Sequence, residues 1–141
     1  AYGFVADTDV AEVGFVAHPT IARAGASPDG LVGDVGLVEI KCPNTATHIA
    51  TLRKGAIADK YQVQMQWQMA CTGRGWCDFV SFDPRMPEEM RLFVKRVPRD
   101  AERIASLEAE VITFLREVAD EVDALRAQYG EPIPTPIFAA G

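Results

Sequence analysis

The stretch that decides the fold is Ser27-Pro28-Asp29-Gly30-Leu31-Val32-Gly33-Asp34-Val35-Gly36-Leu37-Val38-Glu39-Ile40-Lys41-Cys42-Pro43. Apolar residues surround Glu39 and Lys41 in the pattern of a buried strand, yet both of these side chains carry a charge. A buried charge costs free energy unless it is paired or binds a metal. Such a conflict between local pattern and burial is typical of functional sites. We therefore interpret the stretch as a glycine-punctuated hairpin that carries a site.

The register of this hairpin decides which side chains meet. Side chains alternate along a strand, so Glu39 and Lys41 point to the same face. A two-residue turn would direct Asp29 away from Glu39, whereas a three-residue loop at residues 34–36 pairs Asp29 with Lys41. We predict the three-residue loop, because Gly36 suits the left-handed position that closes it. The prediction brings the two acids and the lysine together on one face.

Two carboxylates on one face suit a hard divalent cation. Asp29 and Glu39 can bind Mg²⁺ or Mn²⁺ through oxygen, and the backbone carbonyl of Ile40 can add a third oxygen. Lys41 can then orient or deprotonate an attacking water while the metal stabilises charge on a phosphate. These residues predict a metal-dependent nuclease site.

The same residues resemble a known family. Asp29, Glu39 ten residues later and Lys41 resemble the core motif of the PD-(D/E)XK nucleases. The flanking residues of Ser27-Pro28-Asp29-Gly30 and Glu39-Ile40-Lys41-Cys42-Pro43 are similar to the phage-exonuclease branch, the YqaJ-type viral recombinases with phage lambda exonuclease. The resemblance continues into Tyr61-Gln62-Val63-Gln64-Met65-Gln66-Trp67-Gln68-Met69 and Phe82-Asp83-Pro84-Arg85-Met86, and so covers roughly residues 10–97.

The resemblance implies an α/β fold with a mixed β-sheet flanked by helices, and a Mg²⁺-dependent exonuclease that degrades double-stranded DNA ends from 5′ to 3′ in phage recombination. It also implies a homo-oligomer such as a ring trimer, a single-strand annealing protein as partner, and a phage or prophage gene expressed in a bacterial cytoplasm. Gln66 matches the active-site glutamine of the family, and Gln64 the glutamine before it. The branch has a further acid where this chain has Pro19, and the neighbouring His18 is a candidate substitute.

Along the chain, apolar spacing and turn residues predict one nuclease domain, residues 1–130, followed by a proline-rich extended tail, residues 131–141. We expect the chain to begin inside its domain, after the start of a first helix. The predicted strands cover residues 10–17, 76–83 and 90–97. The predicted helices run from Asn44 or Thr45 to Gly55, from 58 to 71, and from 100 to 129.

Composition sets limits on the possible classes of protein. Of the 141 residues, 48% are hydrophobic and 24% charged, which is ordinary for a globular domain. No apolar run approaches the ~20 residues of a membrane span. Three cysteines, an odd number without metal-ligand spacing, favour a reducing cytosol over a disulfide framework. The net charge of −6 argues mildly against DNA binding, for which a basic face is usual. Phosphate contacts are predicted for Arg53, Lys54, Gln64 and Arg74.

Two other hypotheses stay open. One is a catalytically inactive nucleic-acid-binding or scaffold remnant of the same fold, favoured by Pro19 and the negative charge. The other is a buried salt-bridged triad of Asp29, Glu39 and Lys41 in an unrelated α/β domain. A glutamine that faces the triad distinguishes a site from a purely structural triad, and Gln66 is the predicted one.

Overall fold

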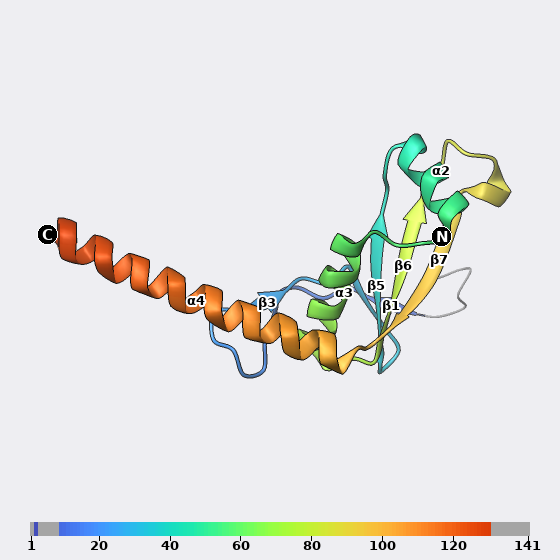
Figure 1. The fold of residues 1–141 in the computed structure, drawn as a ribbon. Coiled ribbons are helices and arrows are strands. Elements are labelled where there is room, and N and C mark those ends of the chain that lie inside the picture. Colours follow the sequence, from blue (N-terminus) through green and yellow to red (C-terminus); the bar gives the residue numbers. More distant parts are fainter. Residues whose placement is uncertain (1, 3–8, 131–141) are drawn as a thin grey trace, which may run out of the picture.

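A computed structural model describes Tyr2 and residues 9–130. The predicted tail, residues 131–141, lies outside the described residues, as does most of the predicted end of a first helix. Five strands form a mixed sheet in the order β1-β4-β5-β6-β7, and β2 and β3 form a separate antiparallel pair. Helices flank the sheet, and one long helix projects from it (Figure 1). The predicted fold class is thus confirmed.

The hairpin of β4 (Gly30–Val32) and β5 (Gly36–Lys41) differs from the prediction in its register. Val32 pairs with Gly36, so the loop has three residues, but they are residues 33–35 rather than 34–36. Gly33, with φ 53°, takes the left-handed position that was expected for Gly36. Continued by one residue, this pairing places Asp29 opposite Glu39 and not opposite Lys41. A shift of two residues preserves the face of every side chain, so the shared face survives the correction.

Gly36 is needed in the strand for a different reason. A Cβ atom at this position would lie 2.2 Å from the ring of Trp76, with which Gly36 is paired across the sheet. Such a distance is shorter than van der Waals contact permits. A glycine is therefore required at position 36 because the Trp76 ring packs directly against it. The left-handed position of the turn is taken by Gly33.

Strand β5 lies at the centre of the sheet. It pairs in parallel with β6 (Trp76–Phe82), and β6 pairs antiparallel with β7 (Leu92–Pro98). At the other edge, β1 (Val10–Ala11) pairs with β4. The single strand predicted for residues 10–17 is wrong, because β2 (Val16–Ala17) belongs to the second sheet, where it pairs with β3 (Gly25–Ala26).

Two helices connect the parallel strands β5 and β6. Asn44 caps α2 (Thr45–Lys54) by accepting a hydrogen bond from the backbone N–H of Thr47, as one of the two predicted caps. The second helix, α3 (Asp59–Thr72), packs over the sheet and buries Met65 and Met69 completely. These methionines and Ala70 of the same helix share the main core with Leu37, Ile57, Cys77, Phe79 and Ile104. This packing fixes which face of α3 meets β5.

The last helix, α4 (Ala101–Tyr129), extends far beyond the sheet (Figure 1). Asp100 caps it through the backbone N–H of Arg103. Of its residues only Ile104 is buried. The exposed large apolar side chains along it are Ile112, Phe114, Val118, Val122, Leu125 and Tyr129. No helix in the described part of the chain is long and apolar enough to cross a membrane.

Candidate active site

Glu39 is the centre of the candidate site. It lies on β5 with only 2% of its surface exposed. Its oxygen Oε1 accepts hydrogen bonds from Lys41 Nζ at 2.7 Å and from Gln64 Nε2 at 2.9 Å. Its oxygen Oε2 accepts one from Gln68 Nε2 at 2.8 Å. Three donors, one of them charged, offset the cost of removing this carboxylate from water.

Lys41 stands beside Glu39, as strand alternation predicted. Its ammonium also donates to Gln64 Oε1 at 3.5 Å and lies 4.9 Å from the centre of the Tyr61 ring. Burial opposes the charge on Lys41, but the hydrogen bond and charge of Glu39, with the charge of Asp29, outweigh it and raise the pKa. In this arrangement Lys41 is protonated and donates hydrogen bonds to Glu39 and Gln64.

Asp29 immediately precedes β4 and is exposed. Its Oδ2 accepts a hydrogen bond from the backbone N–H of Ile40 at 2.7 Å, which anchors the carboxylate beside β5. This bond and the β4–β5 register place Asp29 beside the part of β5 that carries Glu39 and Lys41. Asp29, Glu39 and Lys41 are thus brought together as expected.

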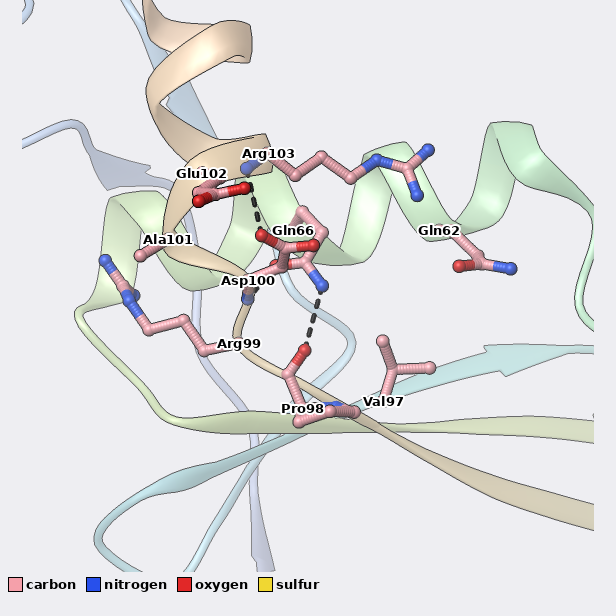
Figure 2. Close-up of a pocket in the computed structure, with 9 residues that line it drawn as sticks. All are labelled: Gln62, Gln66, Val97, Pro98, Arg99, Asp100, Ala101, Glu102 and Arg103. Carbon is pink, nitrogen blue, oxygen red and sulfur yellow. Dashed lines mark hydrogen bonds between the residues drawn. The ribbon is translucent and has the colours of Figure 1, made fainter.

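Gln66 does not face this group, which corrects the expectation drawn from the family pattern. It is 3% exposed and lies at the turn between β7 and α4, where its Nε2 donates to the carbonyl of Pro98 at 2.9 Å and its Oε1 accepts from the N–H of Asp100 at 2.9 Å (Figure 2). Successive helical residues are ~100° apart, so positions 64 and 68 share a face from which position 66 points away. The missed residue is Gln68, which the i, i+4 spacing from Gln64 could have revealed.

Figure 2 also shows the surface pocket beside Gln66, which has a volume of about 460 Å³. It lies between α3 and the start of α4, and neither Glu39 nor Lys41 lines it. The pocket is separate from the cluster around Glu39.

The predicted phosphate contacts have different positions. Arg53 and Lys54 are exposed in the last turn of α2. Gln64 belongs to the cluster around Glu39. Arg74 donates through Nη1 to the carbonyls of Gly33 at 2.8 Å and Gly36 at 2.9 Å, so it braces the hairpin loop. The phosphate contact predicted for Arg74 stays a prediction.

His18 has a structural role and is not a candidate metal ligand. Its Nδ1 accepts hydrogen bonds from the backbone N–H groups of Thr20 and Ile21. The proton therefore sits on Nε2, which donates to Glu108 Oε1 at 2.8 Å. The ring also stacks on Trp67. His18 thus attaches α4 to the loop that follows β2.

A second polar cluster lies where β5 and β6 end. The buried Asp83 accepts hydrogen bonds from Arg85 and Thr45, which hold the pKa of its carboxyl below the usual range. Arg85 also donates to the carbonyl of Pro43, directly after the site strand. The buried His48 bonds to Ser81 and to the carbonyl of Met90. This cluster fixes α2 against the sheet and so supports the end of β5.

The oxygen atoms around Glu39 are of the kind that bind a hard divalent cation. Asp29 and Glu39 supply carboxylate oxygens, and the buried Oε1 of Gln68 has no hydrogen-bond partner among the described residues. Within those same residues, no group of three histidine, cysteine or acidic side chains forms a more complete site. Oε1 of Glu39 already accepts two hydrogen bonds, so a cation that binds this oxygen would displace one of its donors. Gln64 is exposed and is the easiest donor to displace.

Comparison with known proteins gives consistent results. The family model described as "YqaJ-like viral recombinase domain" matches residues 1–75, more than half of the chain. The structure is similar to that of an alkaline exonuclease (LHK-Exo) from Laribacter hongkongensis, with 54% identity, a TM-score of 0.89, and coverage of 90% of this chain and 66% of that one. The same protein in complex with dAMP matches with 54% identity, a TM-score of 0.89, and coverage of 90% and 65%.

A more distant structure supports the fold alone. It is a phage-related exonuclease from Haemophilus somnus 129PT, with 16% identity, a TM-score of 0.66, and coverage of 86% of this chain and 66% of that one. No curated protein sequence matches. The chain spans just under two thirds of the Laribacter exonuclease. The matched family model and the resemblance of the hairpin agree, and the chain belongs to the family of YqaJ-like viral recombinase domains.

Proposed function

We propose that residues 1–130 form the nuclease domain of a Mg²⁺-dependent exodeoxyribonuclease that degrades linear double-stranded DNA from its 5′ ends. The observation that carries the proposal is the cluster of Asp29, Glu39 and Lys41 on one face, with Gln64 bonded to both Glu39 and Lys41. The similarity to an alkaline exonuclease at 54% identity supports the same reaction class.

Each residue has a role that its position supports. Asp29, Glu39 and the carbonyl of Ile40 would hold the Mg²⁺, for which Mn²⁺ could substitute. The bound metal supplies Lewis-acid stabilisation of charge on the scissile phosphate and activation of water. Lys41, held as a cation by Glu39, positions the water or a phosphate oxygen. Gln64 bonds to both Lys41 and Glu39 and so fixes the positions of the two side chains relative to each other.

The wider setting of the protein follows the family. LHK-Exo is known in complex with dAMP, and a nucleoside monophosphate is the product class that an exonuclease releases. We expect the chain to form a ring-like homo-oligomer and to act with a single-strand annealing protein. The proposed compartment is the cytoplasm of a bacterium that carries the phage or prophage. All three cysteines are free thiols, in agreement with that compartment.

The test is degradation of 5′-phosphorylated linear duplex DNA with Mg²⁺, with circular duplex DNA and EDTA as controls. Lys41→Ala should lower the rate by roughly 100-fold or more, the range seen for loss of a group that assists proton transfer. Lys95→Ala is the matched control, because Lys95 bonds to the carbonyl of Gly55 and does not touch Glu39. Degradation of circular DNA at the same rate, or full activity of Lys41→Ala, would contradict the proposal.

A second candidate is a remnant that binds DNA without cleaving it. Two observations favour it: both oxygens of Glu39 are engaged by side chains, and the net charge is −6. Its signature would be DNA binding without degradation in Mg²⁺. By contrast, the glutamines 64 and 68 that face Glu39 argue against a purely structural triad.

A further inference from the structure

We propose that Gln68 is a positioning residue that holds Oε2 of Glu39 from the buried side, so that only Oε1 is presented to the cation and to Lys41. The inference rests on the proposed function of this site. It assigns a role to a side chain outside the predicted set, and it predicts that Glu39 binds the metal through one oxygen.

The two oxygens of Glu39 are held by two amides that lie one helical turn apart on α3. Gln64 reaches Oε1 at 2.9 Å and Gln68 reaches Oε2 at 2.8 Å. Their surroundings differ, because Gln64 is exposed whereas only 2% of Gln68 is accessible. Gln68 lies on the part of α3 that buries Met65 and Met69, so it cannot swing aside without disturbing the core. Gln64 can leave Glu39, and Gln68 stays.

The orientation of the Gln68 amide follows from its partner. A flipped amide would point Oε1 at the carboxylate oxygen of Glu39, and two acceptors repel each other. In the observed orientation Oε1 is buried and has no hydrogen-bond partner among the described residues. A buried unpaired carbonyl oxygen costs free energy that an apolar side chain of similar size would avoid. The bond to Glu39 is therefore what the glutamine at this position provides.

A fixed Oε2 has a consequence for metal binding. Oε2 keeps one lone pair beside its bond from Gln68, but Gln68 is buried, whereas a cation shared with the exposed Asp29 would approach from the side of Gln64 and Lys41. Here Oε1 is shared by the exposed Gln64 and the half-buried Lys41, which can both rearrange. Metal binding through Oε1 alone displaces Gln64 and leaves the bond to Gln68 intact.

The test compares Gln68→Met with Gln62→Met in the full chain. Gln62 is a matched control on the same helix, because its amide bonds to the carbonyl of Ile57 and does not touch Glu39. Isothermal titration with Mg²⁺ or Mn²⁺, without DNA, should show metal affinity about 10- to 100-fold weaker for Gln68→Met, the range for loss of an outer-sphere partner. Gln62→Met should bind as the wild type does. For DNA hydrolysis, Gln68→Met should lower kcat with KM for DNA within about twofold of wild type.

A second measurement does not depend on the variant folding. In NMR spectra of the wild-type chain, Mg²⁺ should shift the side-chain amide signals of Gln64 and leave those of Gln68 in place. Equal shifts of both amides, or unchanged metal affinity in a folded Gln68→Met variant, would overturn the inference. If the wild type binds Mg²⁺ with the expected dependence on Gln68 but degrades no DNA, the proposed function fails while the inference stands. If the wild type degrades DNA and Gln68→Met binds metal normally, only the inference fails.

Discussion

The helices α3 and α4 reverse the usual rule for which side chains are buried. Helix α3 buries two amides, Gln66 and Gln68, beside its methionines. Helix α4 leaves most of its large apolar side chains exposed and buries only Ile104. Both sequences have helical periodicity, yet periodicity does not say which partner covers a face. The two buried amides of α3 bond to Glu39 and to the β7–α4 turn. Whether a side chain is buried therefore depends on the partner that it meets there, and not on its own polarity.

The difference extends to what stabilises each helix. Burial against the sheet stabilises α3. Helix α4 has 29 residues and is about 43 Å long at 1.5 Å per residue. Its described contacts are concentrated near its start, at Ile104 in the core and at Glu108 with His18. Past residue 119, where α4 leaves the loop at residues 20–22, its large apolar side chains are exposed in the described part of the structure.

The largest expected effect is the difference in unfolding free energy between replacing a leucine in the sheet core and replacing one on α4. Leu37→Ala should lower the free energy of unfolding by about 2–5 kcal/mol, because the side chain is fully buried in the main core. Leu125→Ala on α4, where the leucine is 46% exposed, should change it by no more than about 0.5 kcal/mol. Urea unfolding of both variants measures the contrast. A cost above about 1 kcal/mol for Leu125→Ala would break the comparison and show that this face of α4 is covered in solution.

The next effect concerns the attachment of α4. Glu108→Ala should cost about 1–3 kcal/mol, because it leaves the buried Nε2–H of His18 without its partner. Glu110→Ala is the control on the same helix, and its exposed side chain should contribute within about 0.5 kcal/mol. Thermal unfolding measures both variants. Equal stability of the two would mean that His18 does not attach α4 in solution.

A smaller effect is the response of the sheet end to acid. Hydrogen bonds from Arg85 and Thr45 lower the pKa of Asp83, so its ionised form stabilises the fold above the unfolded pKa of about 3.9. This contribution is lost as the pH falls from that range through the folded pKa. Asp83→Asn should therefore lower the urea midpoint at pH 7. Between pH 7 and pH 3, the midpoint of this variant should fall less than that of the wild type. Asp120→Asn on the exposed part of α4 should follow the wild-type pH profile, and a wild-type profile for Asp83→Asn would refute the role of this cluster.

The smallest expected effect leaves stability unchanged and reports packing. Burial raises the pKa of the Cys71 thiol to about 11 and also raises that of Cys77, whereas Cys42 is exposed beside Lys41. A thiol reagent at pH 8 should modify Cys42 quickly in the folded chain and all three cysteines after unfolding. Fast modification of Cys71 or Cys77 in the folded chain would show that the core around α3 opens readily.

Local rules predicted much of the fold and part of the site. Strand alternation was enough to place Glu39 and Lys41 on one face, and the cap at Asn44 required only neighbouring residues. The hairpin register was wrong because it depends on the approach of Gly36 to Trp76, far along the chain. Gln66 was wrong because a family pattern does not fix the rotation of α3 over the sheet. That rotation depends on which methionines enter the core, and only the assembled structure shows it.

The pairing of β4 with β5 has a consequence for finding this site in other proteins. The loop at residues 33–35 is exposed and points away from the core, so added residues there would lengthen the loop without changing the strand pairs. A single residue added between Asp29 and Leu31 would instead turn the aspartate to the opposite face. The number of residues between the two acids is thus a poor guide to homologous sites. The quantity to compare is whether each acid stands an even number of strand positions from Leu31 and Leu37, which pair across β4 and β5.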